Sequence, residues 1–338
     1  MPCLFYWQHF QRWFEVARSL LILGDGNLSF SRAVAESEPN LPVVATVLDS
    51  EAEFLTRYGD DRNIQRLRKC DNVQLLFGVD ATALPLEWAG EFHYIVMNFP
   101  HPGGKTNLRK SRALASGIFR SVSSIMTDDS EFHLVLAQGQ AGVQYNGGSP
   151  WSSSAPVHEK DSWQVLYLAA DEGLLLDDIS SFCPDAFDGY TSSGYRSSAK
   201  GFNNGKGAQR LIFRKSAPVT LLSEISTLHR PQGHFHILRP YFHHDVSFLF
   251  SDGNVDEGEL LAFELLRQLT GSAVVEVREV EELRSMCPNP YLPNRIYRLT
   301  WQVMEVAVGK RACNKLQEEL REKIQATIKE RNLPLILT

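Results

Sequence analysis

The sequence lacks three features that would assign the protein to a common class at once. Its five cysteines are odd in number, widely scattered and free of any C-x-x-C spacing, which suits a reducing compartment. Positive charge is not in excess, because the formal net charge is -6, and this argues against a protein that coats nucleic acid nonspecifically. No run of about 18 apolar residues occurs, so we expect no membrane span.

Ionisable residues nevertheless cluster locally. Residues 101–125 and 196–215 contain lysines and arginines but no acid, so either segment could meet phosphate or could form an ordinary solvated surface. Four histidines, by contrast, have no second ligand group at a recognised zinc spacing, and we predict no metal site. These histidines are His234, His236, His243 and His244.

Short apolar runs alternate with helical stretches over the first two thirds of the chain. This alternation predicts a parallel, doubly wound α/β sheet. We expect strands at residues 20–23, 43–49, 73–80, 92–99, 132–139 and 208–215. We expect helices at residues 29–37, 51–69, 108–126 and 162–176.

A second domain is expected beyond residue 215. Residues 216–233 carry Pro, Ser and Thr with little periodicity and predict a linker between domains at 19–215 and 234–338. The elements that follow have the order β-α-β-β-α-β, which is the α+β ferredoxin-like arrangement. Its strands are expected at residues 244–250, 273–285, 295–304 and 333–338, and its helices at 257–271 and 310–331.

Gly24 and Gly26 directly follow the first expected strand and precede a helix. Glycine in this position allows a tight turn and a close approach of a ligand to the backbone, while the amides at the start of the helix face polar or anionic atoms. The turn therefore indicates a nucleoside cofactor site. A purely structural turn in an α/β sheet is the alternative.

Two aspartates end the next two strands. Asp49 lies 25 residues after Gly24, where a carboxylate can accept hydrogen bonds from both ribose hydroxyls. Asp80 could accept one from the exocyclic amine of adenine, or could instead cap a following helix. Parallel strands present their carboxyl ends at one edge of the sheet, so these groups are expected to share a crevice. At this point NAD and S-adenosylmethionine fit equally well.

The motif after the fourth strand separates the two cofactors. Asn98, Phe99, Pro100 and His101 form a proline-containing turn within MNFPHPGGK, and hydride transfer has no need of such a turn. An amide and an aromatic ring in a rigid turn are what an unpaired base requires for edge recognition and stacking. The motif favours base methylation. The alternative is a buried turn with Phe99 in the core.

Five segments stand in one order along the first domain: GDGNLSF, DSEAEFLTRYGD, LLFGVDAT, NFPHPGGK and DGYTSSGYR. This set resembles the Rossmann-like methyltransferase domain of the eukaryotic 25S rRNA uridine-N3 methyltransferase family, over roughly residues 19–215. The resemblance implies S-adenosylmethionine as cofactor and RNA as substrate. It places the cofactor at Gly24, Asp25, Gly26, Asn27, Ser29, Asp49 and Asp80, and the target base at Asn98, Phe99, Pro100 and His101.

Residues 236–338 are similar to the ferredoxin-fold anticodon-binding domain of phenylalanyl-tRNA synthetases. The similarity rests on RPYFHHDVSFLF, VVEVREVEEL, RIYRLTWQVM and LQEELREKI, which occur in the same order. It implies a domain that binds transfer RNA or another RNA. The synthetase catalytic domain is absent from the matched region, so aminoacylation does not follow.

Methylation of uridine at N3 requires that N3 lose its proton and be held in line with the methyl carbon. His101 is a candidate proton acceptor, because the pKa of an unperturbed histidine lies at about 6.5, close to neutral pH. Asn98 would recognise the edge of the nucleobase. In the alternative, the backbone satisfies His101 and solvent takes the proton.

Two functions of different class stay open. The first is an RNA (uridine-N3) methyltransferase whose second domain selects the RNA, and the second is a noncatalytic RNA-binding or assembly protein that retains the fold. Adenine N6 methylation is disfavoured, because His101 stands where an aromatic residue would be expected. The sequence leaves open ribosomal or transfer RNA as the partner and a cytoplasmic, nuclear, nucleolar or mitochondrial location.

Overall fold

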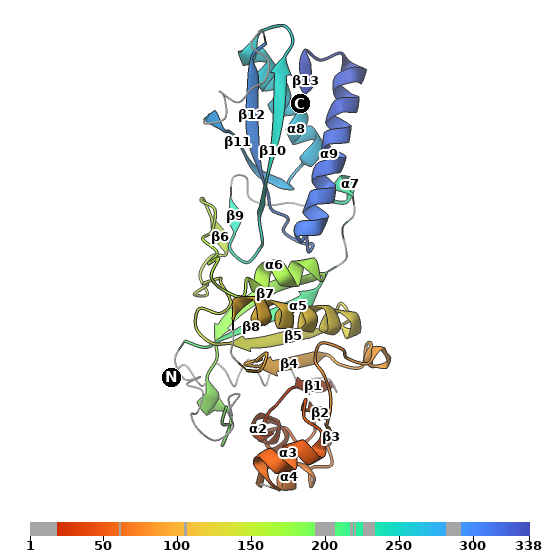
Figure 1. Ribbon diagram of the computed structural model, residues 1–338, viewed down its shortest axis with the longest axis vertical. Coiled ribbons are helices and arrows are strands. Elements are labelled where there is room, and N and C mark those ends of the chain that lie inside the picture. The colour runs from red at the N-terminus through yellow and green to blue at the C-terminus, as the bar shows by residue number, and fades with distance from the viewer. Residues whose placement is uncertain are drawn as a thin grey trace. The chain divides into compact units, whose positions relative to one another are not determined.

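The computed structural model describes residues 19–60, 62–104, 107–192, 207–216, 219, 221–225, 234–281 and 292–338 (Figure 1). The chain divides into two compact units. The first contains Met1–Gly148 and His158–Lys215, and the second contains Ser149–Val157 and Ser216–Thr338. Lys105 and residues 196–206 of the basic segments lie outside the described residues.

A seven-stranded sheet forms the centre of the first unit, with the order β3-β2-β1-β4-β5-β8-β7. The first five strands are parallel, and β8 runs antiparallel to β5 and β7. The predicted sheet is therefore confirmed as predominantly parallel. The strands are β1 (Leu20–Leu23), β2 (Val43–Thr46), β3 (Val73–Leu76), β4 (Tyr94–Asn98), β5 (Glu131–Leu136), β7 (Leu174–Ser181) and β8 (Gln209–Lys215).

Helices pack on both faces of this sheet. On one face, Ile22 of β1 lies in a core cluster with Phe30 and Val34 of α2. On the other, Phe119 of α5 packs edge-on against Phe132 of β5. Successive strand residues point to opposite faces, which is why neighbouring positions of one strand serve different helices. The helices are α2 (Ser29–Ser37), α3 (Glu51–Tyr58), α4 (Arg62–Leu67), α5 (Leu108–Ile125) and α6 (Val165–Asp171), with short 3-10 turns η1 (Leu86–Trp88) and η2 (Pro184–Ala186).

The first unit differs from the sequence prediction in two places. The helix expected at residues 51–69 is two helices, α3 and α4, and α3 ends at Gly59. The helix expected at 162–176 ends at Asp171, and strand β7 begins at Leu174. The prediction was wrong there because a continuous run of buried leucines has no period that separates a strand from a buried helix.

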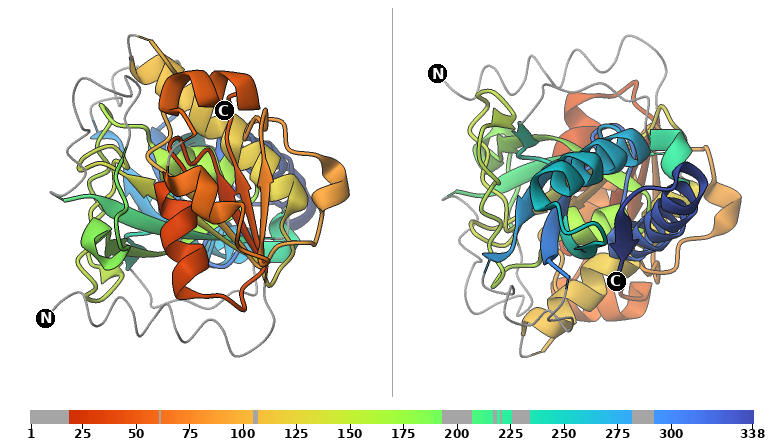
Figure 2. Two further views of the ribbon diagram at one scale, coloured as in Figure 1. Left: turned by 90° about the horizontal axis from the view of Figure 1, so that it is seen from below. Right: turned by 90° about the horizontal axis from the view of Figure 1, so that it is seen from above.

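The second unit contains a four-stranded antiparallel sheet in the order β11-β12-β10-β13. Helices α8 and α9 lie side by side over one face (Figure 2, right). Leu266 of α8 and Leu320 of α9 are buried there with Phe248, Tyr297 and Trp301 of the strands. The elements are β10 (Phe242–Phe250), α8 (Val255–Thr270), β11 (Val274–Glu279), β12 (Asn294–Trp301), α9 (Lys310–Arg331) and β13 (Leu335–Leu337).

Two short additions to the second unit come from segments with no predicted structure. β6 (Trp151–Ser152) pairs antiparallel with β9 (Phe235–His236). Within the expected linker, α7 (Leu222–Ile225) buries Leu222 and Ile225 in the core of the second unit. Elements of two to four residues are too short to show a hydrophobic period, so the sequence pattern does not announce them.

Gly258 of α8 tests the packing of this second core. A Cβ at position 258 would lie 2.2 Å from Cδ1 of Phe250, whose side chain is fully buried. We therefore expect Gly258→Ala to lower the free energy of unfolding by about 1–3 kcal/mol, although the same change in an open helix would raise it by about 1 kcal/mol. Urea unfolding of the wild type and of Gly258→Ala measures the change in free energy. Glu264→Ala, at an exposed position of the same helix, is the control. A gain in stability at position 258 would contradict the packing.

Candidate functional site

The carboxyl ends of β1 and β4 lie next to one another where the strand order reverses. From β1 the chain adds β2 and β3 on one side, and then β4 and β5 on the other. The register pairs Leu23 with Met97, so Gly24 and Asn98 are neighbours at the edge of the sheet. Open α/β sheets bind ligands at such a reversal. This edge is the candidate site.

The glycine turn is fastened to the end of β2. Gly24 has φ +62°, a conformation that side-chain-bearing residues rarely adopt. Its N–H donates to Oγ1 of Thr46 over 3.3 Å, and the N–H of Asp25 donates to the Thr46 carbonyl over 3.0 Å. Thr46 Oγ1 itself donates to the Ile22 carbonyl. One threonine therefore fixes the exit of the chain from β1.

The Asp25 carboxylate turns back onto the start of α2. Its Oδ2 accepts from both N–H and Oγ of Ser31, each over 2.7 Å. Loss of water around the carboxylate raises the pKa of Asp25 to about 6, against the lowering effect of these hydrogen bonds. The side chain therefore builds the turn and keeps a proton at a higher pH than a free aspartate.

Asn27 and Ser29 bind a distant part of the chain. Asn27 Nδ2 donates to the carbonyl and Oγ1 of Thr191, over 3.1 and 2.9 Å. Ser29 Oγ donates to Asn27 Oδ1 over 2.7 Å, and it accepts from the Thr191 N–H over 3.0 Å. Asn27 and Ser29, which were predicted to bind the cofactor, therefore both form hydrogen bonds within the protein.

The two aspartates after β2 and β3 are held differently. Oδ2 of Asp49 pairs with Arg57 of α3 over 2.7 Å. Asp80 is exposed, and its Oδ1 accepts from the N–H and Oγ1 of Thr82 over 2.8 and 2.7 Å. The structure thus places Asp80 in a tight Asp-x-Thr turn and not at the start of a helix. Both carboxylates stand at the same edge as Gly24.

Asn98 is the unusual residue of the edge. Its Nδ2 and Oδ1 are both buried, and neither has a hydrogen-bond partner among the residues that the structure describes. A buried polar group without a partner costs about 1–3 kcal/mol, and native proteins contain few of them. The Asn98 amide therefore has one donor group and one acceptor atom without a partner among the described residues, next to the glycine turn.

The next two residues form a strained, packed turn. Phe99 has φ +49° although it is not a glycine, which costs about 1–2 kcal/mol. Its N–H donates to the Val135 carbonyl, and its ring lies edge-on to Phe182 with the centroids 5.7 Å apart. Pro100 is buried. The ring is partly buried against the core, as the alternative interpretation of the motif had it.

His101 is exposed at the end of this turn. Its Nδ1 accepts from the Gly103 N–H over 3.0 Å, which fixes the orientation of the ring. Desolvation lowers the pKa of His101, so the imidazole is neutral at pH 7. A neutral imidazole is the form that can take up a proton.

Three residues that shape this edge were not predicted from the sequence. Thr46 sits in the apolar strand VVAT, where a lone hydroxyl is a weak signal. Phe182 and Thr191 follow the unpredicted strand β7, so their position was not foreseeable. The motif DGYTSSGYR pointed to the segment of Thr191 but not to its contacts.

The described residues contain no candidate metal centre and no candidate membrane span. No three His, Cys, Asp or Glu side chains in that part of the chain are grouped as a metal site would require. Among the described helices, none combines the length and apolarity that crossing a bilayer demands.

The fold defines a class first: a Rossmann-like α/β unit whose polar strand ends gather at the strand reversal. Within that class, the chain belongs to the rRNA (uridine-N3-)-methyltransferase BTM5-like family, whose model matches residues 21–194. The family resemblance carried by the five sequence segments is thereby confirmed.

Individual relatives show how far the similarity extends. The human Ferredoxin-fold anticodon-binding domain-containing protein 1 is 36% identical over 206 residues, which make up 60% of this chain and 31% of the relative. The 25S rRNA (uridine(2634)-N(3))-methyltransferase of Saccharomyces cerevisiae is 24% identical over 228 residues, 52% of this chain and 66% of the relative. A solved 16S rRNA methyltransferase, KamB, is 18% identical with a TM-score of 0.39, over 62% of this chain and 94% of that one. The chain spans about a third of the length of the human relative.

The raised pKa of Asp25 predicts a pH dependence of stability. Because the pKa of Asp25 in the folded protein, about 6, lies above its ordinary value of 3.8, the protonated form favours folding, and this contribution is lost as the pH rises from about 4 to about 6. Asp25→Asn keeps an acceptor for Ser31 without the titration. We expect its stability relative to the wild type to increase by on the order of 2–3 kcal/mol between pH 4 and pH 7, measured by urea unfolding. If the stabilities of the wild type and Asp25→Asn changed in parallel with pH, the raised pKa of Asp25 would be contradicted.

Proposed function

We propose that the first unit is an S-adenosylmethionine-dependent methyltransferase that modifies N3 of uridine in ribosomal RNA. The single observation that carries the proposal is the buried, unpartnered amide of Asn98 beside the turn at Gly24. The polar edge of a nucleobase can supply hydrogen-bond partners for such an amide.

The edge suits the cofactor of this family. Gly24 and Gly26 leave the turn without side chains, so a ligand can approach the backbone closely. Asp49 would accept from the ribose hydroxyls and Asp80 from the adenine amine, the roles expected from the sequence. Asp25, Asn27 and Ser29 hold the shape of the turn through the protein contacts described above. Bound S-adenosylmethionine supplies an electrophilic methyl group.

The other side of the edge suits an unpaired uracil. Nδ2 of Asn98 would donate to a uracil carbonyl oxygen next to N3, which leaves N3 itself free to lose its proton and to face the methyl carbon. Phe99 and Phe182 supply aromatic surface. His101, neutral because its pKa is lowered, is the group proposed to accept the N3 proton, at Nδ1 and in exchange for the hydrogen bond from the Gly103 N–H. Orientation of N3 toward the methyl carbon would contribute most to the rate.

Features outside the edge are consistent with an RNA substrate. Helix α5 begins with exposed Arg109 and Lys110 and carries no acid in its first turn, which favours contact with phosphate. The yeast relative is named for a uridine of 25S rRNA, and we extend that substrate class to this chain. A protein that acts on ribosomal RNA would work in the nucleolus or the cytoplasm.

We further propose that the second unit is a ferredoxin-like module that binds RNA and selects the substrate, with the domain division near residue 215. In support, its chain order is β-α-β-β-α-β, its sheet is antiparallel, and both helices pack on one face. The open face carries the Asp245–Arg298 ion pair next to His243, so charge of both signs is present. The alternative for the whole chain is a noncatalytic RNA-binding or assembly protein.

Calorimetric titration with S-adenosylmethionine tests the cofactor site. We expect the wild type to bind and Asp49→Ala to bind at least tenfold more weakly, about 1.4 kcal/mol or more, because the ribose hydroxyls lose their acceptor. Glu51→Ala is the matched control, since Glu51 is an exposed carboxylate two residues further along the chain that pairs with Arg68 instead. A folded wild type that does not bind would favour the noncatalytic alternative.

Asn98→Leu tests the assignment of the base reader. Removal of a buried, unpartnered amide should raise the free energy of unfolding by roughly 1–3 kcal/mol, whereas methyl transfer should fall by about a hundredfold or more. The substrate is a transcript of yeast 25S rRNA that contains uridine 2634, with detection of 3-methyluridine by mass spectrometry.

The control transcript carries cytidine at that position and should receive no methyl group. Retained transfer by Asn98→Leu would refute the role of the amide, and wild-type transfer to a pool of transfer RNA instead of this transcript would refute the ribosomal assignment.

A further inference from the structure

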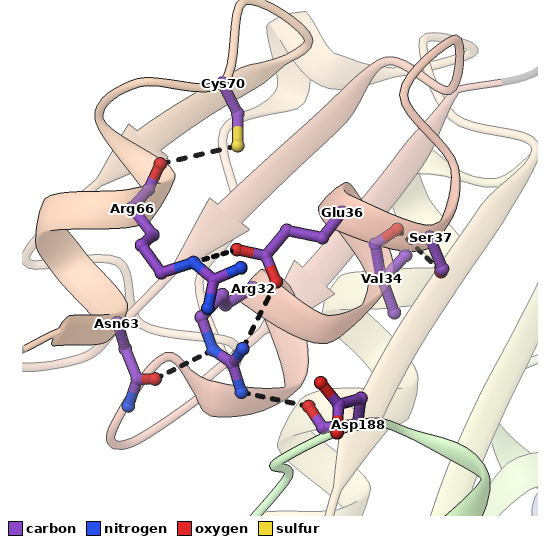
Figure 3. Close-up of polar contacts among 8 residues, drawn as sticks. All are labelled: Arg32, Val34, Glu36, Ser37, Asn63, Arg66, Cys70 and Asp188. Atoms are coloured by element: carbon purple, nitrogen blue, oxygen red, sulfur yellow. Dashed lines mark hydrogen bonds and ion pairs between the residues drawn. The ribbon is translucent and has the colours of Figure 1, made fainter.

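A buried arginine links three parts of the first unit. Arg32 of α2 is only 5% exposed. Its Nε donates to Oδ1 of Asn63 in α4 over 2.9 Å, one guanidinium nitrogen donates to Glu36 over 3.2 Å, and the other donates to the carbonyl of Asp188 over 2.9 Å (Figure 3). A buried guanidinium is tolerated only where such partners satisfy it. Arg32 is therefore a fixed point of the fold.

The Asp188 side of this contact is closely fitted. Gly189 follows the bound carbonyl with φ +63°, and a Cβ at this position would lie 2.4 Å from the guanidinium nitrogen of Arg32. Any side chain there would therefore meet both backbone strain and a steric clash. The backbone at Gly189 therefore lies against the Arg32 side chain with no room for a Cβ.

The same arginine reaches the glycine turn through Asn63. Asn63 Oδ1 is held by Arg32, and Asn63 Nδ2 donates to the carbonyl of Asn27 over 3.1 Å. Asn27 in turn donates to Thr191. A chain of hydrogen bonds therefore connects Arg32, through Asn63 and Asn27 of the glycine turn, to Thr191 at the end of the segment 188–191.

The segment also reaches the turn of the proposed base site. The ring of Tyr190 packs against Phe30 and Phe182, with centroids 5.5 and 6.1 Å apart. Phe182 packs against Phe99. Residues 188–191 therefore stand between the glycine turn and the Phe99 turn, and Arg32 sets where they stand.

We propose that Arg32 is a positioning residue for ligand binding at this edge, and that it acts through Asn63 and the segment 188–191. We call Arg32, Asn63 and residues 188–191 together the Arg32 clamp. In this view Asn27 and Ser29 bind to the clamp. The proposal deepens the proposed function and depends on it for one of its two readouts, the affinity for S-adenosylmethionine. The other readout, amide hydrogen exchange, needs no ligand.

Arg66 provides a matched control. It pairs with the same Glu36 from α4, and it takes no part in the hydrogen bonds that join Arg32 to Asn63 and Asp188 or Asn63 to Asn27. Its side chain is 38% exposed, against 6% for the side chain of Arg32. Arg66→Gln therefore removes a guanidinium and an ion pair from the same cluster and leaves the clamp whole.

The experiment uses the full chain with Arg32→Gln, Arg32→Lys and Arg66→Gln. We expect Arg32→Gln to speed exchange of the Thr191 amide, which is bound to Ser29 Oγ, at least tenfold, and to weaken S-adenosylmethionine binding about tenfold at a temperature where all variants are folded. Arg32→Lys can still donate to one acceptor and should recover part of both losses. Arg66→Gln should match the wild type in both.

Gly189→Ala serves where Arg32→Gln does not fold, because position 189 is exposed and the substitution displaces the segment while Arg32 stays in place. It should show the same two changes. Unchanged Thr191 exchange in these variants would overturn the clamp, and faster exchange with unchanged affinity would overturn its role in ligand binding. A wild type that does not bind S-adenosylmethionine, with exchange responding as expected, would reject the proposed function and retain the clamp.

Discussion

The register between β1 and β4 is the constraint on which the candidate site depends. Leu23 and Met97 stand level in the sheet, and both are buried in the core. A slip of one residue would turn every side chain of a strand to the other face, at the cost of the apolar core on both sides. The packing of leucine, isoleucine and valine therefore determines that Gly24 and Asn98 meet. The chemistry of the edge is positioned by residues that take no part in it.

Polar groups at this edge divide into two kinds. The side chains of Asp25, Asn27 and Ser29 have partners within the chain, and each partner fixes the turn or the segment at 188–191. Asn98 has none among the described residues. The first kind contributes to the stability of the site and the second lowers it, because buried polar groups retain their desolvation cost until a partner arrives. This difference separates construction of the site from recognition of a ligand.

The sequence predicted the position of the edge but not the contacts within it. Strand ends at Gly24, Asp49, Asp80 and Asn98 follow from local periodicity, and they were foreseeable because parallel strands end together. Asn27 and Thr191, by contrast, are 164 positions apart in the chain. No local pattern reports a hydrogen bond of that range. The partner lies beyond β7, which begins in a leucine run that carries no period, so the segment could not be placed.

The consecutive position of two unfavourable features bears on whether this edge recognises a ligand or only retains a fold. Asn98 carries an unsatisfied amide, and Phe99 carries a left-handed backbone. An apolar side chain at 98 and a glycine at 99 would remove both costs without any change to the strand order. Strain of this kind persists where the surrounding structure imposes it, and it gathers at binding and catalytic sites. Since Phe99 is held by Val135 and Phe182, the fold imposes the strain next to the buried Asn98 amide, which our proposal assigns to ligand recognition.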